Sequence, residues 1–281
     1  MRSFFILLLS LAVMVPVKAE AELKVDFIDI GQGDSILIET PNKEHILIDG
    51  GPPDKGKMLL HFLEKRNVEK LDTMIATHPD FDHIGGLIDV IDTLPVEKIM
   101  EIDIPHFTKT YLSYKSKRLM KRIPVSNPRM NQAIKLDDGI SLTFLNTVEK
   151  TRSMNENSIA ILLSYGAIDF LLTADITRQE EQRLLKNHQI EAEILKVAHH
   201  GSKTSTSYQF LEKVNPSVAV ISYEVNNPFG HPVASTITNL IKSGSTVYST
   251  AKVGTITVQT DGKTFNVTYP GKDKVIYNKP S

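Results

Sequence analysis

The sequence predicts an α/β fold in which strands form the inner layers and helices lie outside. Three observations support this prediction. Short apolar runs rich in β-branched residues recur along the chain, stretches with helical spacing separate them, and no Pro-, Gly- or Ser-rich tract interrupts the order. Strand-rich segments around two helical sets fit a layered sandwich with its sheets inside. A chain of this length can bury one large core, since α/β folds of roughly 200 to 250 residues commonly form one domain.

The first half is expected to contain four strands and one helix. The strands are the apolar, β-branched runs at 23–30, 35–39, 45–48 and 73–76. Between the last two, residues 58–67 carry apolar side chains at Met58, Leu59, Phe62 and Leu63, which is helical spacing. The order therefore ends in a strand, a helix and a strand.

The second half repeats this rhythm without obvious sequence identity. Strands are expected at 141–145, 158–165, 169–174, 193–198, 217–222, 246–249, 254–260 and 264–269. Helices are expected at 177–187, 207–214 and 234–243. We expect a single domain over residues 22–281, with a short polar tail after Tyr269.

The first 21 residues are typical of a cleavable signal peptide. Arg2 precedes an apolar run at residues 4–15, and small residues follow at Ala19 and Ala21. The alternative is an uncleaved membrane anchor, but crossing a bilayer takes roughly 20 apolar residues. We therefore expect a secreted protein with no membrane span after cleavage, either free outside the cell or associated with its surface.

Composition excludes several classes of protein. Apolar residues make up 41% and charged residues 23% of the chain, which excludes a disordered or fibrous protein. The formal charge of −1 provides no overall field toward nucleic acid or anionic membranes, so an electrostatic partner needs a local patch. Without any Cys, metal ligands must come from His and carboxylates.

The segment T-H-P-D-F-D-H-I-G-G carries the strongest functional signal. His78, Asp80, Asp82 and His83 fall within six residues, directly after an expected strand. In an extended segment His78 and Asp80 share one side, and Asp82 and His83 at a helix start could reach the other. This geometry suits two neighbouring divalent ions. The alternative is a polar turn capped by Asp, which would not need the flanking histidines.

Further candidates also follow expected strands. They are Asp49, Asp175, the pair His199 and His200, and His231 in the segment N-P-F-G-H-P. Each alone has an ordinary explanation as a helix cap or a surface residue. Together they predict that carboxylates and imidazoles converge on one site.

These motifs resemble the metallo-β-lactamase superfamily, and in particular the extracellular hydrolase domain of the DNA-uptake channel protein ComEC and its stand-alone relatives. The segments that carry the resemblance, in the family's order, are F-I-D-I-G-Q-G-D-S-I-L-I, I-L-I-D-G-G, H-P-D-F-D-H-I-G-G, N-E-N-S-I-A, L-L-T-A-D, L-K-V-A-H-H-G-S and F-G-H-P. The resemblance implies a four-layer αββα sandwich with two divalent metal ions at one edge. It also implies a competence-related hydrolase that acts on the phosphodiesters of DNA.

The adjacency of these residues suggests a role for each candidate. His78 and Asp80 would bind the first ion, Asp82 and His83 the second, and Asp175 would bridge them. The remaining ligand of the second ion is left open among three histidines: His199, His200 and His231. We expect Asp82, Asp175 and His200 to take part in catalysis. Asp49 would orient an imidazole ligand. Asp34 would either orient a ligand or simply belong to a tight G-Q-G-D-S turn.

The sequence departs from the superfamily's His-x-His-x-Asp-His pattern. Asp80 stands where the second His would be, and the stretch that usually supplies a third His offers Asn157 and Ser158. Harder oxygen ligands shift metal preference from zinc toward manganese or magnesium, so the metal is left open between Zn and Mn.

Residues 104–136 contain eight Lys and Arg and no Asp or Glu. Phe107, Tyr111 and Tyr114 lie among them. Cations with interleaved aromatic rings suit single-stranded nucleic acid, whereas the alternative is a solvated connection. The expected nucleic-acid-binding residues are Lys117, Arg118, Lys121 and Arg122, with Lys203 after the paired histidines.

The sequence thus predicts a secreted, metal-dependent nuclease or phosphodiesterase whose partner is DNA or another phosphodiester. Two alternatives remain. One is a hydrolase of small esters, lactones or β-lactams on the same fold, and the other is a non-catalytic DNA-binding relative.

Overall fold

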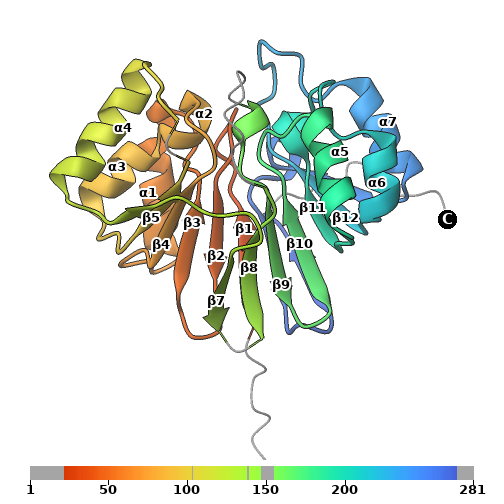
Figure 1. The fold of residues 1–281 in the computed structure, drawn as a ribbon, viewed down its shortest axis with the longest axis horizontal. Helices are drawn as coiled ribbons and strands as arrows, with labels where there is room; N and C mark the ends of the chain where they lie inside the picture. The colour runs from red at the N-terminus through yellow and green to blue at the C-terminus, as the bar shows by residue number, and fades with distance from the viewer. Residues whose placement is uncertain (1–21, 103, 138, 147–154, 271–281) are drawn as a thin grey trace, which may run out of the picture.

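The computed structural model describes residues 22–102, 104–137, 139–146 and 155–270. In this part of the chain two sheets lie face to face and helices cover the outer face of each (Figure 1). The predicted four-layer αββα sandwich is confirmed. The expected leader and the tail after residue 270 lie outside the described residues.

The first sheet contains most of the N-terminal strands and the last two strands of the chain. In spatial order it runs β15 (Phe265–Thr268), β14 (Ile256–Thr260), β1 (Leu23–Phe27), β2 (Ile36–Glu39), β3 (His45–Ile48), β4 (Thr73–Ala76), β5 (Ile99–Glu101) and β6 (Val125–Ser126). The C-terminal strand β14 pairs antiparallel with β1, with Val25 opposite Val258. The two ends of the described chain are therefore held in one sheet.

The second sheet is built from the middle and later parts of the chain. Its order is β13 (Thr246–Ser249), β12 (Val218–Ile221), β11 (Ile194–Lys196), β10 (Ile168–Leu172), β9 (Ile161–Tyr165), β8 (Ile140–Phe144) and β7 (Ala133–Asp137). Strands β7 to β10 are antiparallel neighbours, whereas β10 to β13 are parallel.

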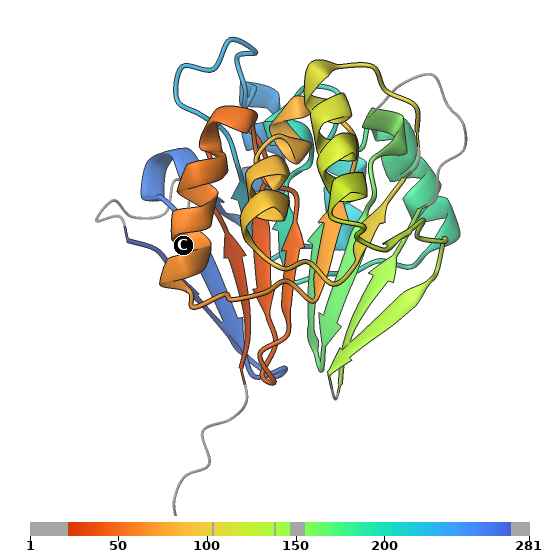
Figure 2. The same ribbon diagram turned by 90° about the vertical axis from the view of Figure 1, so that its left-hand side faces the viewer.

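Helices form the two outer layers. Those beside the first sheet are α1 (Gly56–Lys65), α2 (Phe81–Ile84), α3 (Leu87–Thr93) and α4 (Lys109–Met120); Figure 2 shows this side of the molecule. Those of the second half are α5 (Arg178–Asn187), α6 (Tyr208–Val214), α7 (Ala234–Lys242) and α8 (Thr250–Val253). Among the described residues we find no helix with the length and apolar character needed to cross a membrane.

Three apolar clusters hold these layers together. The central one lies between the sheets and contains inward residues of both, such as Val25, Ile38, Phe144 and Phe170. One outer cluster joins the first sheet to α1, α3 and α4, and the other joins the second sheet to α5, α6 and α7. Full burial of side chains of this size stabilises the fold by about 1.5–3 kcal/mol each. These clusters therefore stabilise the layers that carry the site.

Parallel strands determine where the site forms. Strands β3 and β4 pair in parallel, with Leu47 opposite Met74, and β10 and β11 pair in parallel, with Leu171 opposite Leu195. The carboxyl ends of parallel neighbours lie at the same edge of a sheet, which is where α/β folds bind ligands. The segments that follow these four strands carry the candidate residues.

Some boundaries differ from the predicted ones. The strand expected at 23–30 ends at Phe27, because the chain turns away into the G-Q-G-D-S loop. The strand expected at 158–165 begins at Ile161, and the preceding Ala160 N–H bonds instead to the side chain of Asn146. The short elements α3, β5 and β6 were not predicted, since their apolar runs are too brief to show a period.

Candidate metal centre

The candidate site lies where strands of both sheets end at one edge of the sandwich. Asp49 follows β3 and His78 lies just beyond β4 in the first sheet. In the second sheet Asp175 lies just beyond β10, and His199 lies in the short 3₁₀ turn η3 (Ala198–Gly201) after β11. The structure brings these segments together at one edge, as the sequence predicts.

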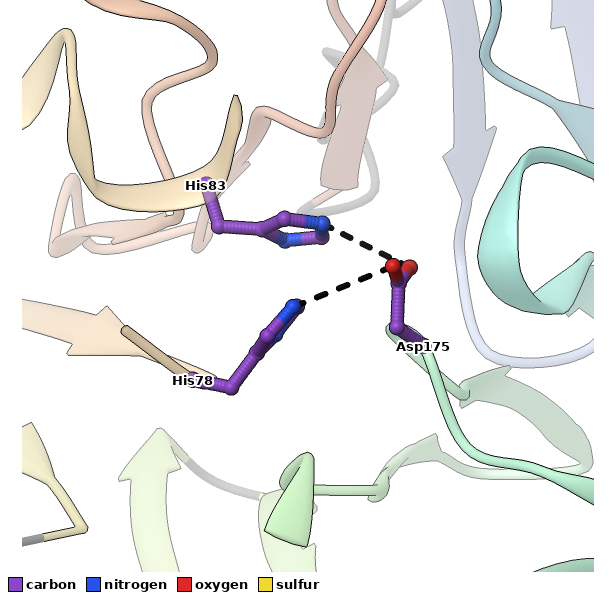
Figure 3. A group of neighbouring side chains, drawn as sticks. All are labelled: His78, His83 and Asp175. Carbon is purple, nitrogen blue, oxygen red and sulfur yellow. Dashed lines mark ion pairs between the residues drawn. The ribbon is translucent and has the colours of Figure 1, made fainter. Parts of the chain in front are cut away.

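Asp175 is the central carboxylate of this site. Its Oδ2 lies 3.8 Å from Nε2 of His78 and 3.6 Å from Nε2 of His199. Its Oδ1 lies 3.4 Å from Nε2 of His83 and 3.8 Å from Nε2 of His200. Figure 3 shows His78 and His83 pointing at Asp175 from the opposite half of the molecule. Each oxygen therefore faces its own pair of imidazoles.

Two more carboxylates extend these pairs into two groups. Asp80 Oδ2 lies 3.6 Å from His78 Nε2, and Asp82 Oδ2 lies 3.5 Å from His200 Nε2. We call His78, Asp80, His199 and Oδ2 of Asp175 the first group. The second group is Asp82, His83, His200 and Oδ1 of Asp175. Asp80 has an extended backbone just before α2, whereas Asp82 lies inside that helix, so their side chains can serve different groups.

The groups are adjacent, and His83 of the second group lies against His78 of the first, with ring centroids 3.9 Å apart. The ligand atoms of His78, His83 and Asp175 all lie within 4.8 Å of one another, and so do those of Asp82, His83 and His200. Such spacing allows one cation per group, with Asp175 between them.

The unpartnered atoms of the site fit divalent metal ions. Nε2 of His78, His83 and His200 and Oδ1 of Asp175 are buried and make no hydrogen bond with the described residues. Buried polar atoms are almost always paired, so four unpaired atoms facing one another call for a ligand. Imidazole nitrogens and carboxylate oxygens are what zinc or manganese binds.

Hydrogen bonds on the far side of two rings leave their Nε2 atoms ready for a metal. His83 Nδ1 lies 2.7 Å from Asp49 Oδ2, and His200 Nδ1 lies 2.9 Å from the Ser222 carbonyl oxygen. A donor at Nδ1 leaves the lone pair on Nε2. Asp49 is itself held by the N–H and hydroxyl of Thr77, at 2.9 and 2.6 Å. The predicted orienting position of Asp49 thus matches its contacts.

The buried imidazoles and carboxylates of the site shift one another's pKa values. Burial, followed by the nearby His83, lowers the pKa of His78 to about 3. Burial would also lower the pKa of His83, but Asp175 and Asp49 outweigh it and raise that pKa well above its usual value. Burial would raise the pKa of Asp175, but His83 and His200 hold it well below its usual range. In the metal-free protein His83 therefore holds a proton that a cation would displace, whereas His78 is neutral.

The adjacent histidines reach separate oxygens of Asp175 because the backbone is unusual there. His199 and His200 have φ of 51° and 54°, in the left-handed region. Consecutive left-handed residues form a tight turn instead of continuing β11, at a cost of order 1 kcal/mol or more each. The buried contacts of His200 and the end of β11 hold this strained turn in place.

Two glycines allow the loops to meet closely. A Cβ on Gly33, in the G-Q-G-D-S loop, would lie 2.3 Å from the carbonyl oxygen of Asp82. A Cβ on Gly86 would lie 2.1 Å from the carbonyl oxygen of Gly50. Any side chain there would push the loops apart, so these glycines keep the ligand-bearing segment against the first sheet.

Asp34 pairs with a residue that sequence reasoning missed. Lys196 is fully buried, and its Nζ lies 2.8 Å from Oδ1 and Oδ2 of Asp34. Asp34 Oδ1 is also 3.5 Å from His200 Nδ1, and the Asp34 N–H donates to the Asp82 carbonyl at 3.2 Å. Asp34 thus contacts two residues of the second group. A lysine inside the apolar run I-L-K-V-A was the signal that could have revealed this pair.

Three other predicted residues lie outside the two groups. His231 packs edge-on against His199, with ring centroids 5.6 Å apart, so it is one ring removed from Asp175. Asn157 and Ser158 are buried in and just after the 3₁₀ turn η2 (Asn155–Asn157). The neighbour that reaches the site is Asn155, whose Nδ2 lies 3.2 Å from His199 Nδ1.

The basic segment differs in part from the expected nucleic-acid surface. Arg118 is buried, with its guanidinium 2.7 Å from Glu101, and therefore does not face solvent as expected. Tyr111 and Tyr114 are also buried and cannot stack on a base. Helix α4 turns these residues toward the core because they share one face of it.

The remaining basic residues lie at the surface. Lys121, Arg122 and Lys203 are exposed, and Lys117 is half-buried with its Nζ 2.8 Å from Asp92. Lys203 follows η3 directly and is the nearest of the four in sequence to the paired histidines.

The chain matches the family model described as "Metallo-beta-lactamase superfamily" over residues 28–224. It is 29% identical to ComE operon protein 3 of Bacillus subtilis (strain 168), over 90% of this chain and 35% of that protein. It is 30% identical to Recombination protein 2 of Haemophilus influenzae, over 84% of this chain and 28% of that protein. The chain thus matches about a third of the length of these relatives.

Comparison with one solved structure supports the fold and nothing beyond the fold. The CmlA β-hydroxylase E377D mutant superposes with a TM-score of 0.55 at 12% sequence identity, covering 85% of this chain and 54% of that one. The arrangement of layers is therefore shared with a solved protein.

Proposed function

The chain belongs to the metallo-β-lactamase superfamily, in its ComEC-like branch, and from this premise we propose that it is a secreted metal-dependent phosphodiesterase that cleaves DNA. One observation carries the proposal: the two oxygens of Asp175 face separate groups of imidazoles and carboxylates whose inner atoms are buried and unpaired. Such a site has little use in a purely structural or DNA-binding protein.

A pair of divalent ions would supply Lewis acidity and lower the pKa of water, as in other two-metal hydrolases. The chain's residues provide the rest. The first and second groups would hold the ions, and Asp49 accepts the Nδ1 proton of His83 and fixes that ring. The exposed Lys203 beside η3 offers positive charge to the phosphate.

We propose manganese or zinc as the metal. Each group combines two imidazoles with two carboxylate oxygens, one of them from the shared Asp175. Replacing an imidazole by Asp80 makes the first group harder than the usual His-rich site and favours manganese there.

The substrate class is proposed from charge. A phosphodiester is an anion, and Lys203 with the exposed Lys121 and Arg122 that follow α4 would attract it. Export through a leader at residues 1–21 would bring the enzyme to extracellular DNA.

The test combines metal analysis with three substrates. Purified protein is loaded with Mn²⁺ or Zn²⁺ and assayed on single-stranded DNA, bis-p-nitrophenyl phosphate and a chromogenic β-lactam, with chelator as the blank. We expect metal-dependent cleavage of the two phosphodiesters. Asp82→Ala should lose about one of two bound ions and lower phosphodiester cleavage at least about 100-fold, since it removes a direct ligand.

Asp92→Ala provides the control, because Asp92 is a half-exposed carboxylate whose partner is Lys117. It should keep its metal content and activity. Unchanged metal content and activity in Asp82→Ala would overturn the assignment, and cleavage of the β-lactam alone would overturn the proposed substrate class.

A further inference from the structure

The loop between β12 and α7 presents an aromatic ring to solvent. In Figure 1 and in Figure 2 this loop rises above the edge of the sandwich at which the site lies. Phe229 lies in it with 55% of its surface exposed, and Val225 of the same loop is also exposed. A single exposed apolar residue needs no explanation by itself. The contacts that hold Phe229 in its exposed position, however, do need an explanation.

One side chain fixes the loop around Phe229. Asn227 Oδ1 accepts hydrogen bonds from the N–H of Phe229 and of His231, both at 3.1 Å. Asn227 Nδ2 donates to the carbonyl oxygens of Glu224 and His231, at 2.9 and 2.6 Å. The same amide thus positions both ring-bearing residues, so the exposed ring is held in place and little entropy is lost when a ligand binds to it.

The rings form a row that leads from the metal centre to the surface. His199 faces Oδ2 of Asp175, His231 packs edge-on against His199 with centroids 5.6 Å apart, and Phe229 stacks on His231 at 5.8 Å with an interplanar angle of 26°. His231 Nδ1 is buried and has no hydrogen-bond partner among the described residues. Because that atom is covered, the surface offered to a ligand is the exposed ring of Phe229, which suits a planar group.

We propose that Phe229 and His231 form a stacking subsite for an unpaired nucleobase next to the phosphate that is cleaved. This inference rests on the proposed phosphodiesterase function and specifies its substrate. A base has a flat face that can stack on Phe229, and base stacking on aromatic side chains is sequence-tolerant. In a duplex both faces of a base are already stacked, so the subsite selects single strands or frayed ends.

The experiment compares strands with and without bases. The probes are a fluorescent oligo(dT) of about eight nucleotides, the same strand with abasic tetrahydrofuran units, and a duplex. Binding is measured by anisotropy in Ca²⁺, and cleavage is measured separately in Mn²⁺. The variants are Phe229→Leu, which keeps apolar volume without a ring, and Phe229→Trp, which keeps a ring.

The expected result is a preference that depends on the ring. The unchanged protein should bind oligo(dT) between about fivefold and a hundredfold more tightly than the abasic strand, the range expected for one stacked base. Phe229→Leu should remove most of that preference and Phe229→Trp should keep it. Asn227→Ala should weaken it, because it removes the four hydrogen bonds that hold the loop.

Three results would overturn the subsite: no preference in the unchanged protein, a preference that survives Phe229→Leu, or an equal dependence on Phe229 for the duplex. A different result would contradict the proposed function. If neither strand is cleaved in Mn²⁺ while binding still follows the ring, the subsite stands and the phosphodiesterase assignment falls.

Discussion

Asp34 and Lys196 illustrate how a buried pair can serve a neighbouring ligand. Lys196 is fully buried with its Nζ 2.8 Å from Asp34, and Asp34 lies beside both His200 and Asp82. Burying two charges is costly, and apolar replacements of such pairs are often neutral or stabilising. A role in holding the second group would explain why charges are used here.

A double-mutant cycle tests this role. Lys196→Met should destabilise the fold by about 3–5 kcal/mol, because it leaves the Asp34 carboxylate buried and unpaired. Adding Asp34→Asn removes that charge and should recover most of the stability. Metal affinity of the second group should nevertheless stay about 10- to 100-fold weaker in the double variant, because the carboxylate beside His200 is gone. Thermal melts and metal titration give the two readouts.

Arg66→Met is the matched control for that cycle. It removes the cation from Asp26, another buried carboxylate, which lies in β1 away from the groups. It should lower stability and leave metal affinity unchanged. Recovery of both stability and metal affinity in the double variant would show that the Asp34 and Lys196 pair supports the fold only.

At the scale of elements, α4 separates exposed from buried basic residues. Its inner face carries Tyr111, Tyr114 and Arg118, and the hydroxyl of Tyr114 donates to Glu101 at 2.7 Å. Lys121 and Arg122, at and after its end, face solvent. Only the exposed residues are available to a phosphate backbone.

This division gives a salt-dependence prediction. Replacing both Lys121 and Arg122 by Ser should weaken single-stranded DNA binding and reduce the slope of log K against log[salt] by about 0.7 for each phosphate that is no longer neutralised. Arg118→Met should lower the melting temperature through the loss of its Glu101 partner and leave the slope unchanged. Anisotropy titrations over a range of salt concentrations measure the slope. An unchanged slope in the Ser variant would mean that α4 faces only water.

At the scale of the whole molecule, metal binding joins the two halves. The first half supplies His78, Asp80, Asp82 and His83, while the second half supplies Asp175, His199 and His200. A ligand that binds only the folded state stabilises it by mass action, about 4 kcal/mol at a thousand times its dissociation constant. Removing the metal should therefore lower the melting temperature.

The size of that effect should depend on pH. In the metal-free protein the pKa of His83 is raised well above 6.5, so its proton stabilises the fold below pH 6.5 and this contribution is lost as pH rises through the folded-state pKa. Cations take the place of that proton and bind better as pH rises. The difference in unfolding free energy between loaded and chelated protein, and with it the gap in melting temperature, should widen from about pH 6.5 to 8.5, by up to about 1.4 kcal/mol per pH unit for one proton.

Scanning calorimetry with and without chelator measures this gap. Asp82→Ala, which lacks a ligand of the second group, should show a smaller gap with a weaker pH dependence. A gap that stays constant or narrows toward pH 8.5 would contradict the exchange of a proton for a cation.

The sequence by itself determined the layered fold and most of the site. Short apolar runs rich in β-branched residues predict strands because such side chains suit a buried sheet, and ligand-type residues at strand ends predict a shared edge. His78, Asp80, Asp82, His83, Asp49 and Asp175 could all be chosen this way, since a metal site needs these residue types.

Tertiary structure alone decided how those residues divide. The left-handed turn at His199 and His200 gives each ring a different oxygen of Asp175, and places His231 one ring further out. The faces of α4 and the partner of Lys196 were likewise fixed only by packing. Sequence spacing determines which residues can share an element, but the direction of a side chain depends on backbone dihedral angles and on neighbours that are distant in the chain.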